Sequence, residues 1–427
     1  MATPLGIALL GMGTVGSAVA RELKTHADLL AERTGGPLLL RCVADRDPLR
    51  LRPLLLSGVA LADDGAVALA RRDVDIAVEL IGGLEPAGTL LHQAVQSGLG
   101  TVTANKAVIA RAGPELAAEV RPGSGGLAFE AAVGAAIPVL AMLRDSLRGD
   151  SIRSITAVIN GTTNYVLGRL HGGESLDVAV AEAQRQGYAE ADPSADLDGL
   201  DAAAKLCILA WFGLGVSVTP DQVDRRGIRD LGPVDAAAAA QLGFALRLVA
   251  RAELVPGGLD LSVQPALVPL AGHPLGRVEG ADNVVVVESD LAGELVLRGR
   301  GAGADAAASA VLSDIVAVAR ARREGRTVPL PPAVPAHVLD PREAETASAL
   351  RLRVRGGTEV TGIVTQMFEE HGIPVERTTP GPGDGDLLVL LGPAARDTLA
   401  PAMEALRALP VVEAVEQTLD RLVTRGE

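Results

Sequence analysis

A glycine-rich turn near the N-terminus constrains the fold of this chain more than any other feature. GMGTVG places Gly11, Gly13 and Gly16 directly after the apolar run LGIALL and before a helix-like stretch that starts at Thr14. Glycines at this spacing permit a tight turn and let a pyrophosphate approach the N-terminus of a helix closely. A strand, this turn and a helix together predict a dinucleotide-binding domain.

The second apolar run ends in VADRD, at the position where such a domain selects its nucleotide. Asp45 can accept a hydrogen bond from the ribose 2′-hydroxyl of NAD, whereas Arg46 can pair with the 2′-phosphate of NADP. The sequence leaves both nucleotides open.

Short apolar runs alternate with helix-like stretches throughout residues 1–145, which is typical of a parallel sheet with crossover helices. We therefore expect a Rossmann-like, doubly wound α/β domain there. From 146 to 325, the strand-like runs SITAVI, LSVQPALV, NVVVVES and ELVLRG predict an α+β domain for substrate binding and dimerisation. Within it, residues 311–323 are expected to form an amphipathic helix that can pack back on the first domain.

The last part of the chain begins with a proline-rich segment, residues 326–345, which is expected to be an extended linker. Residues 346–427 then run strand, helix, strand, strand, helix, strand. This βαββαβ order predicts a ferredoxin-like domain with four strands and two helices on one face.

The composition restricts the partners and the compartment. A net charge of −14 and a pI near 5.0 argue against a broad surface for nucleic acid or for an anionic membrane, because both need a basic face. Cys42 and Cys207 lie in apolar runs without metal-ligand spacing, which indicates a reducing compartment. The N-terminus lacks the basic region of a signal peptide, and the apolar runs are too short to cross a bilayer. We therefore expect a soluble, cytoplasmic protein that binds small molecules.

Lysine is scarce, since Lys24, Lys106 and Lys205 are three of 39 basic residues. An ammonium can lose its proton when it is buried and a guanidinium cannot, so a retained lysine is a candidate acid or base. Lys205 ends the stretch GYAEADPSADLDGLDAAAK, and Asp201 lies one helical turn before it on the same face. The helix continues as the apolar LCILAW, so this face is expected to line a polar pocket that suits a zwitterionic amino acid. The alternative is a solvated acidic loop whose aspartates cap helices.

Two further motifs concentrate scarce polar residues. TANK, residues 103–106, follows the fourth parallel strand, and ligands of open α/β sheets bind at the carboxyl ends of strands. NGTTNY, residues 160–165, follows a strand of the second domain. The chain has four asparagines and two tyrosines, and these two motifs with GYAEADP contain Asn105, Asn160, Asn164, Tyr165 and Tyr188.

The motifs GMGTVG, VELIGG, TVTANKA, FEAAVGAAIP and INGTTNYVL, followed by the stretch from Ala183 to Lys205, resemble the homoserine dehydrogenase family over about residues 1–325. The resemblance implies interconversion of L-homoserine and L-aspartate 4-semialdehyde with NAD or NADP. It also implies that Lys205 protonates the carbonyl oxygen as hydride arrives, and that Lys106 stands near both the nicotinamide and the substrate.

The same resemblance implies the other site residues. The substrate would be bound by Glu190, Asp201, Asp196, Thr162 and Tyr188. The nucleotide would be bound by Gly11, Gly13, Thr14, Val15, Gly16, Asp45, Arg46, Thr103, Asn105 and Lys106. A monovalent cation, sodium in this family, would be bound by Glu130 and the backbone carbonyls of Val133, Ala135 and Ile137. For Glu130, the alternative is a carboxylate that only ends a strand.

The tail resembles an ACT domain, a regulatory module that binds amino acids, which implies threonine as an effector. A dimerisation module is the alternative, and we expect a homodimer or a homotetramer. The sequence departs from the family at three places: Ala135 and Ala136 replace glycines, Ala306 and Ala307 replace a Pro-Thr pair, and GGTEVTG, residues 356–362, lacks the Pro-Gly pair of an effector loop.

Two other functions stay open at this point. One is a non-catalytic amino-acid sensor with a vestigial nucleotide domain. The other is a related oxidoreductase that acts on another small amino or oxo acid.

Overall fold

The computed structural model describes residues 2–51, 58–356 and 359–423, and the chain divides into two compact units. Unit 1 consists of Met1–Ile152, Ala204–Pro220 and Leu297–Pro335. Unit 2 consists of Arg153–Ala203, Asp221–Val296 and Ala336–Glu427. This grouping differs from the three consecutive domains expected from the sequence, because two later segments fold with the N-terminal unit. One of them contains residues 311–323, which were expected to be able to pack back on the first domain.

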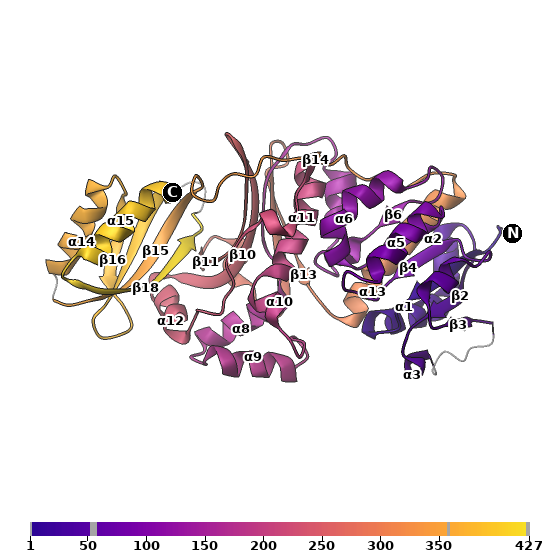
Figure 1. The fold of residues 1–427 in the computed structure, drawn as a ribbon, viewed down its shortest axis with the longest axis horizontal. Helices are drawn as coiled ribbons and strands as arrows, with labels where there is room; N and C mark the ends of the chain where they lie inside the picture. Colours follow the sequence, from indigo (N-terminus) through magenta and orange to yellow (C-terminus); the bar gives the residue numbers. More distant parts are fainter. Residues whose placement is uncertain (1, 52–57, 357–358, 424–427) are drawn as a thin grey trace. The chain divides into compact units, whose positions relative to one another are not determined.

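Unit 1 is built on a parallel six-stranded sheet in the order β3-β2-β1-β4-β5-β6. Strands β2, β3, β4 and β6 are labelled in Figure 1. The strand order reverses between β1 and β4, as in a doubly wound nucleotide-binding fold, which confirms the α/β prediction for this part. The strands are β1 Leu5–Leu10, β2 Leu38–Ala44, β3 Ala60–Ala62, β4 Ile76–Glu79, β5 Gly100–Thr103 and β6 Leu127–Ala128.

Helices cover both faces of this sheet because the residues of β1 alternate between them. Ile7 and Leu9 pack with α1, α2 and α13, whereas Ala8 and Leu10 pack with α4 and α5. The helices of unit 1 include α1 Thr14–Thr25, α2 Ala27–Thr34, α3 Pro48–Leu51, α4 Gly65–Leu69, α5 Ala87–Gln96, α6 Lys106–Glu119, α7 Val139–Ala141 and α13 Ala304–Arg323.

Apolar packing explains why the two later segments belong to unit 1. Helix α13 contributes Val311, Ile315 and Val318 to the core of the sheet, and all three are fully buried. Helix α11 (Leu200–Leu214) contributes Trp211, whose ring stacks on Phe129 with centroids 5.6 Å apart.

Unit 2 is built on a mixed sheet in the order β13-β12-β7-β10-β11-β18-β15-β17-β16, with β9 paired to β11. Strands β10 and β11 form a long antiparallel hairpin, and α8 and α12 pack against β10. The elements of the first part are β7 Ile152–Val158, α8 Gly161–His171, α9 Leu176–Arg185, α10 Ser194–Leu197, β9 Asp224–Arg225, α12 Pro233–Leu242, β10 Phe244–Val255, β11 Gly258–Pro269, β12 Asp282–Ser289 and β13 Glu294–Arg300.

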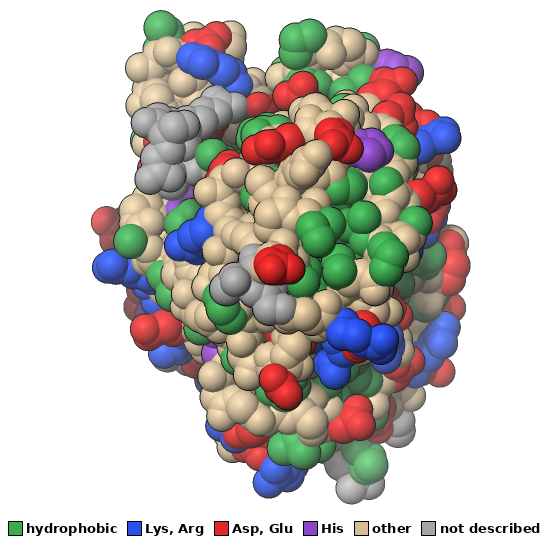
Figure 2. Space-filling view, turned by 90° about the vertical axis from the view of Figure 1, so that its left-hand side faces the viewer, with side chains coloured by type: hydrophobic (Ala, Val, Ile, Leu, Met, Phe, Trp, Pro, Cys, Tyr) green, Lys and Arg blue, Asp and Glu red, His purple; other side chains and the backbone are tan. Residues whose placement is uncertain are grey.

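Residues 345–421 of unit 2, which we name the C-terminal module, have the βαββαβ order expected from the sequence. The elements are β15 Glu345–Val354, α14 Glu359–Glu370, β16 Val375–Pro380, β17 Asp386–Ala395, α15 Arg396–Ala408 and β18 Val412–Arg421. Helices α14 and α15 lie side by side against the sheet of the module (Figure 1). Together with the sheet they enclose an apolar core that includes Phe368 and Leu406. On the face of the module drawn in Figure 2, acidic and basic side chains are interspersed among hydrophobic ones. Of the effector-loop motif, residues 357 and 358 lie outside the described residues.

The C-terminal module continues the sheet of unit 2. Strand β18 pairs in parallel with β11 through Ala266 with Asp420 and Leu267 with Arg421. The preceding segment is extended and hydrogen-bonded: within unit 1, Thr327 bridges Gly125, and within unit 2, Val338 bridges Leu259. Among the described residues, every helix is too short or too polar to span a bilayer.

Candidate active site

The glycine-rich turn joins β1 to α1 at the carboxyl end of the parallel sheet. Gly11 has φ +96°, in the region that favours glycine, and a Cβ on Gly16 would lie 2.0 Å from the carbonyl oxygen of Gly11. At Gly13, the N-cap of α1, an added Cβ would meet nothing within 4 Å. The turn therefore leaves open space at the start of α1, where the amides of Thr14 and Val15 have no partner inside the helix.

A pocket of about 720 Å³ lies beside this turn and is lined by residues that include Gly11, Gly13, Asp45, Arg46, Arg50 and Leu80. The Asp45 carboxylate accepts from the amides of Met12 at 2.6 Å and Asp47 at 2.9 Å, so it fastens the end of β2 to the turn. Arg46 is exposed, and the guanidinium of Arg50 lies 3.8 Å from the Asp45 carboxylate. The pocket thus offers both a carboxylate and guanidinium groups to the ribose of a nucleotide.

Glu79, at the end of β4, is a buried carboxylate that the sequence motifs do not assign a role. One oxygen accepts from the amides of Ile81 and Gly82 at 2.7 and 3.1 Å, and the other accepts from the hydroxyl of Thr103 at 2.5 Å. The Thr103 hydroxyl in turn accepts from the amide of Asn105 at 2.9 Å. Glu79 therefore holds the ends of β4 and β5 together. The sequence signal for Glu79 was an acidic residue within the apolar run IAVEL.

The TANK motif forms the N-terminus of α6. The side-chain oxygen of Asn105 accepts from the amide of Val108 at 3.3 Å, and its amide nitrogen donates to the carbonyl of Gly83 at 2.7 Å. Lys106 is the first residue of α6 and is half-buried. Thr103, Asn105 and Lys106 are therefore brought together at one edge of the sheet.

The three lysines differ in their surroundings. Lys24 is exposed on α1, Lys106 is half-buried on α6, and Lys205 is buried within α11 with 8% of its surface exposed. The apolar continuation of α11 explains the burial, because the residues after Lys205 form part of the core. An ammonium in such a position is a candidate for proton transfer.

Asn160 organises the acidic motif of unit 2 from the N-terminus of α8. Its side-chain oxygen accepts from the amide of Thr163 at 2.8 Å and caps the helix. Its amide nitrogen donates to Asp196 at 2.7 Å and to Asp201 at 2.8 Å. Two half-buried carboxylates, both predicted to bind substrate, thus meet at one buried amide. The sequence pattern marked Asn160 only as part of a polar motif.

The other predicted substrate residues lie on or beside the loop that follows α9. The hydroxyl of Thr162 donates to the carbonyl of Tyr188 at 2.7 Å, and the ring of Tyr188 lies 4.8 Å from that of Tyr165. The side chain of Glu190 is exposed, while its backbone carbonyl accepts from Gln184 at 3.1 Å. The loop is therefore tied down through its backbone, and the Glu190 carboxylate faces solvent.

Glu130 is buried and accepts two backbone hydrogen bonds at the start of α7, from Leu140 and Ala141, both at 2.8 Å. Its own amide donates to Asp314 at 2.7 Å. Burial raises the pKa of Glu130, and burial together with the charge of Glu130 raises the pKa of Asp314 well above its ordinary value. A cation near Glu130 would offset this burial of negative charge.

The segment after Glu130 turns sharply. The amide of Ile137 donates to the carbonyl of Gly134 at 3.0 Å. Ala135 has φ +46°, and all other described non-glycine residues have negative φ. The oxygen-only donor set, one carboxylate and the carbonyls of Val133, Ala135 and Ile137, fits a hard monovalent cation. The described residues contain no group of three or more His, Cys, Asp and Glu side chains placed to hold a metal ion.

Comparison with known proteins identifies relatives over almost the whole chain. The family model "Homoserine dehydrogenase, NAD binding domain" matches residues 11–130, and the model "Homoserine dehydrogenase" matches residues 138–316. A homoserine dehydrogenase of Corynebacterium glutamicum is 38% identical, with 97% of this chain and 95% of the relative covered.

Solved structures agree with this result. The structure of a homoserine dehydrogenase from Thiobacillus denitrificans superposes with a TM-score of 0.91, at 31% identity and 98% coverage of both chains. A hyperthermophilic archaeal homoserine dehydrogenase in complex with NADPH has a TM-score of 0.62 at 29% identity. That alignment covers 97% of the archaeal chain but 74% of this one.

Proposed function

This chain belongs to the homoserine dehydrogenase family, and we propose that its activity as an NAD(P)-dependent oxidoreductase depends on Lys205 as the group that transfers the proton. The observation that supports this role is the burial of Lys205 in α11, one helical turn after Asp201. Nearly all other basic residues of the chain are arginine.

The reaction interconverts the alcohol of L-homoserine and the aldehyde of L-aspartate 4-semialdehyde by oxidation and reduction. The nicotinamide, when bound, supplies or accepts the hydride. As the aldehyde oxygen becomes an alkoxide, the Lys205 ammonium donates a proton to it, and in the oxidation the neutral amine takes that proton back. Arginine cannot do this because its guanidinium does not release a proton.

Carboxylates of unit 2 bind the ammonium group of the amino acid. Asp196 and Asp201 are oriented by the amide of Asn160, so their positions are fixed before substrate arrives. Glu190 is exposed and available on its loop, which Thr162 anchors at the backbone of Tyr188.

The nucleotide occupies the open side of the glycine-rich turn. Gly13 leaves room for the pyrophosphate at the start of α1, and Asp45 or Arg46 contacts the adenosine ribose. Thr103, Asn105 and Lys106 hold the nicotinamide end. The NADPH complex of the archaeal relative supports a nicotinamide dinucleotide as the cofactor.

A monovalent cation, sodium by family resemblance, is held by Glu130 and the carbonyls of Val133, Ala135 and Ile137. The burial of the Glu130 carboxylate supports this site. When bound, the cation would supply positive charge beside the buried Glu130 carboxylate.

The βαββαβ order of the C-terminal module supports an ACT domain, and we propose threonine as the effector that it binds. The enzyme acts in the cytoplasm as a homodimer or homotetramer. Sedimentation velocity with and without threonine tests the assembly and the effector together.

Substitution of Lys205 tests the proposed proton transfer. We expect Lys205→Met to lower kcat with homoserine by about 10²- to 10⁴-fold, the usual contribution of a general acid or base. The Kd for NADPH, measured by fluorescence titration, should stay within about twofold of wild type, since a methionine fills a similar volume.

Lys24→Met is the matched control, because Lys24 is exposed on α1, and its kcat should equal that of wild type. Near-normal turnover by Lys205→Met would show that another group moves the proton. A wild-type chain that reduces no nucleotide with homoserine but does so with another hydroxy amino acid would show that the substrate is different.

A further inference from the structure

Residues 225–230 lie between the C-terminal module and the acidic segment that carries Asp196 and Asp201, all within unit 2. We name them the 225–230 segment. It begins with the last residue of the short strand β9, and the amide of Arg226 donates to the carbonyl of Val263 on β11 at 2.9 Å. The segment is thereby fixed to the central hairpin, with one side turned to each neighbour.

One side of the 225–230 segment is hydrogen-bonded and ion-paired to residues 197 and 198. The amide of Ile228 donates to the carbonyl of Leu197 at 2.8 Å, and the guanidinium of Arg229 forms an ion pair with Asp198. Gly227 lies so close that an added Cβ would be 2.2 Å from the carbonyl oxygen of Leu197. The contact is therefore made by backbone at van der Waals distance.

This contact determines the positions of the two protein carboxylates, Asp196 and Asp201, that are proposed to bind the substrate. Leu197 and Asp198 lie between Asp196 and Asp201, and Gly199, with φ +75°, turns the chain into α11. A shift of the 197–198 backbone would move both aspartates relative to Asn160. The two hydrogen bonds of Asn160, at 2.7 and 2.8 Å, leave little room for such a shift.

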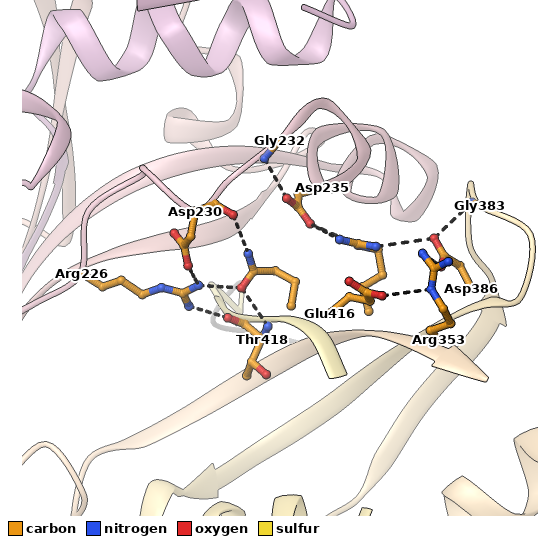
Figure 3. A network of polar contacts seen from close by, with 11 residues as sticks. Arg226, Asp230, Gly232, Asp235, Arg353, Gly383, Asp386, Glu416 and Thr418 are labelled. Carbon is orange, nitrogen blue, oxygen red and sulfur yellow. Dashed lines mark hydrogen bonds and ion pairs between the residues drawn. The ribbon is translucent and has the colours of Figure 1, made fainter. Parts of the chain in front are cut away.

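The other side of the 225–230 segment is hydrogen-bonded to β18 of the C-terminal module through Arg226, as Figure 3 shows. The guanidinium of Arg226 donates to the carbonyl of Thr418 at 2.7 Å and to the side-chain oxygen of Gln417 at 2.6 Å, and it also pairs with Asp230. Gln417 is 8% exposed, and its amide nitrogen donates to the carbonyl of Asp230 at 3.5 Å. A largely buried amide and a guanidinium thus form a closed link between the two parts.

We propose that Arg226 is a positioning residue that couples strand β18 of the C-terminal module to Asp196 and Asp201, the two carboxylates proposed to bind the substrate. The proposal rests on the proposed role of these two aspartates in binding homoserine. The path is continuous: Gln417 and Thr418 hold Arg226, its neighbours hold the 197–198 backbone, and that backbone holds the aspartates. Any event that moves β18 therefore changes the affinity of the enzyme for its amino-acid substrate.

Steady-state kinetics of Arg226→Met test the coupling. We expect the KM for homoserine to rise about three- to tenfold, while kcat and the KM for the nucleotide stay within about twofold, because residues along such a path modulate the coupling without touching the reacting atoms. Gln417→Leu should raise KM similarly. The double variant should be no worse than either single variant, because both remove the same contact. Arg226→Lys, which keeps the positive charge on a single donor nitrogen, should recover part of the loss.

Arg355→Met is the matched control. Arg355 lies in the same module and pairs with Glu413 at an exposed site, remote in sequence and partners from the 225–230 segment. Its KM should equal that of wild type. An unchanged KM in folded Arg226→Met and Gln417→Leu, or an equal rise in Arg355→Met, would overturn the proposal.

Hydrogen–deuterium exchange separates this proposal from the proposed function. We expect the amides of residues 194–201 to exchange at least threefold faster in Arg226→Met and in Gln417→Leu than in wild type or Arg355→Met, because local opening becomes easier. Faster exchange with no activity on homoserine in any variant would retain the coupling and reject the substrate. Unchanged exchange in both variants would reject the coupling whatever the substrate is.

Discussion

Gly13 and Gly16 lie three residues apart in one turn, yet their surroundings are opposite. A Cβ on Gly16 would overlap the carbonyl oxygen of Gly11 at 2.0 Å, whereas a Cβ on Gly13 would meet nothing within 4 Å. We expect Gly16→Ala to destabilise the fold by about 1–3 kcal/mol through overpacking. Gly13→Ala should leave the melting temperature unchanged but weaken nucleotide binding about tenfold or more, because its methyl group occupies the space where the pyrophosphate approaches.

Thermal denaturation and fluorescence titration with NADPH check both variants. Equal loss of melting temperature in the two variants would mean that the turn around Gly13 is packed. Unweakened binding by Gly13→Ala would place the nucleotide elsewhere.

His273 predicts how stability depends on pH. Its Nδ1 accepts from the amide of Leu275 at 3.2 Å, which requires that nitrogen to be unprotonated, and burial lowers the pKa of His273 below its ordinary value of 6.5. As pH falls through 6.5, the unfolded chain takes up the proton first. The stabilisation by neutral His273 is therefore complete above pH 6.5 and declines as pH falls towards the folded-state pKa.

Urea denaturation at pH 7.5 and pH 5.0 measures this effect. His273→Asn keeps a capping acceptor that does not titrate, so its free energy of unfolding should fall less between the two pH values than that of wild type. His337→Gln is the control, because His337 is exposed, and it should follow the wild-type curve. Identical pH dependence in wild type and His273→Asn would contradict the prediction.

The turn at residues 133–137 connects η2 (Glu130–Ala132) to α7 under backbone strain. Ala135 has φ +46°, a conformation that costs a residue with a Cβ about 1–2 kcal/mol. Ala135→Gly should remove this strain and, after the larger entropy of glycine in the unfolded chain, raise the free energy of unfolding by about 0.5–1 kcal/mol. Ala136→Gly, next to it at ordinary φ, should lower the free energy by a similar amount. Chemical denaturation in sodium-free buffer checks the pair, and equal signs would contradict the strain.

Elements that depend on local pattern could be predicted from the sequence. Short apolar runs such as LGIALL, alternating with helix-like stretches, predicted the parallel strands, and the βαββαβ order predicted the elements of the C-terminal module. Local periodicity is sufficient for these because it reports which face of each element is buried.

Contacts between segments far apart in the chain could not be predicted in the same way. The pairing of β11 with β18 involves only Leu267, Ala266 and their two partners, and no local pattern marks it. Asn160 likewise became important only when folding brought Asp196 and Asp201 to its amide. In each case the deciding hydrogen bonds join residues more than 30 positions apart.

At the scale of the whole chain, the C-terminal module contacts the rest of unit 2 through packed side chains as well as through the connecting segment. Leu242 of α12 and Leu267 of β11 line the same small cavity as Leu350, Leu388 and Leu419 of the module. Buried charge adds to this apolar contact, because the side chains of Asp235 and Arg351 pair at 3.1 Å with 6% and 13% exposed. Unit 2 is therefore expected to unfold as one body with its module.

Removal of the module tests this expectation. A chain that ends at Ala344 would expose Leu242 and Leu267, each worth about 1.5–3 kcal/mol when buried. At roughly 2–4 °C per kcal/mol for units of this size, the melting temperature should fall by about 10 °C. Static light scattering should also detect association through the exposed β11 edge.

The archaeal relative makes the outcome informative, since 97% of its chain aligns with only 74% of this one. A shorter chain therefore superposes on about three quarters of this one, and truncation tests whether this chain can also do without its C-terminal module. If the shortened chain stayed monodisperse with an unchanged melting temperature, residues 326–345 would be a simple linker between independent bodies. Aggregation that Leu242→Gln relieves would instead show that this chain has come to depend on the apolar contact between α12 and the C-terminal sheet.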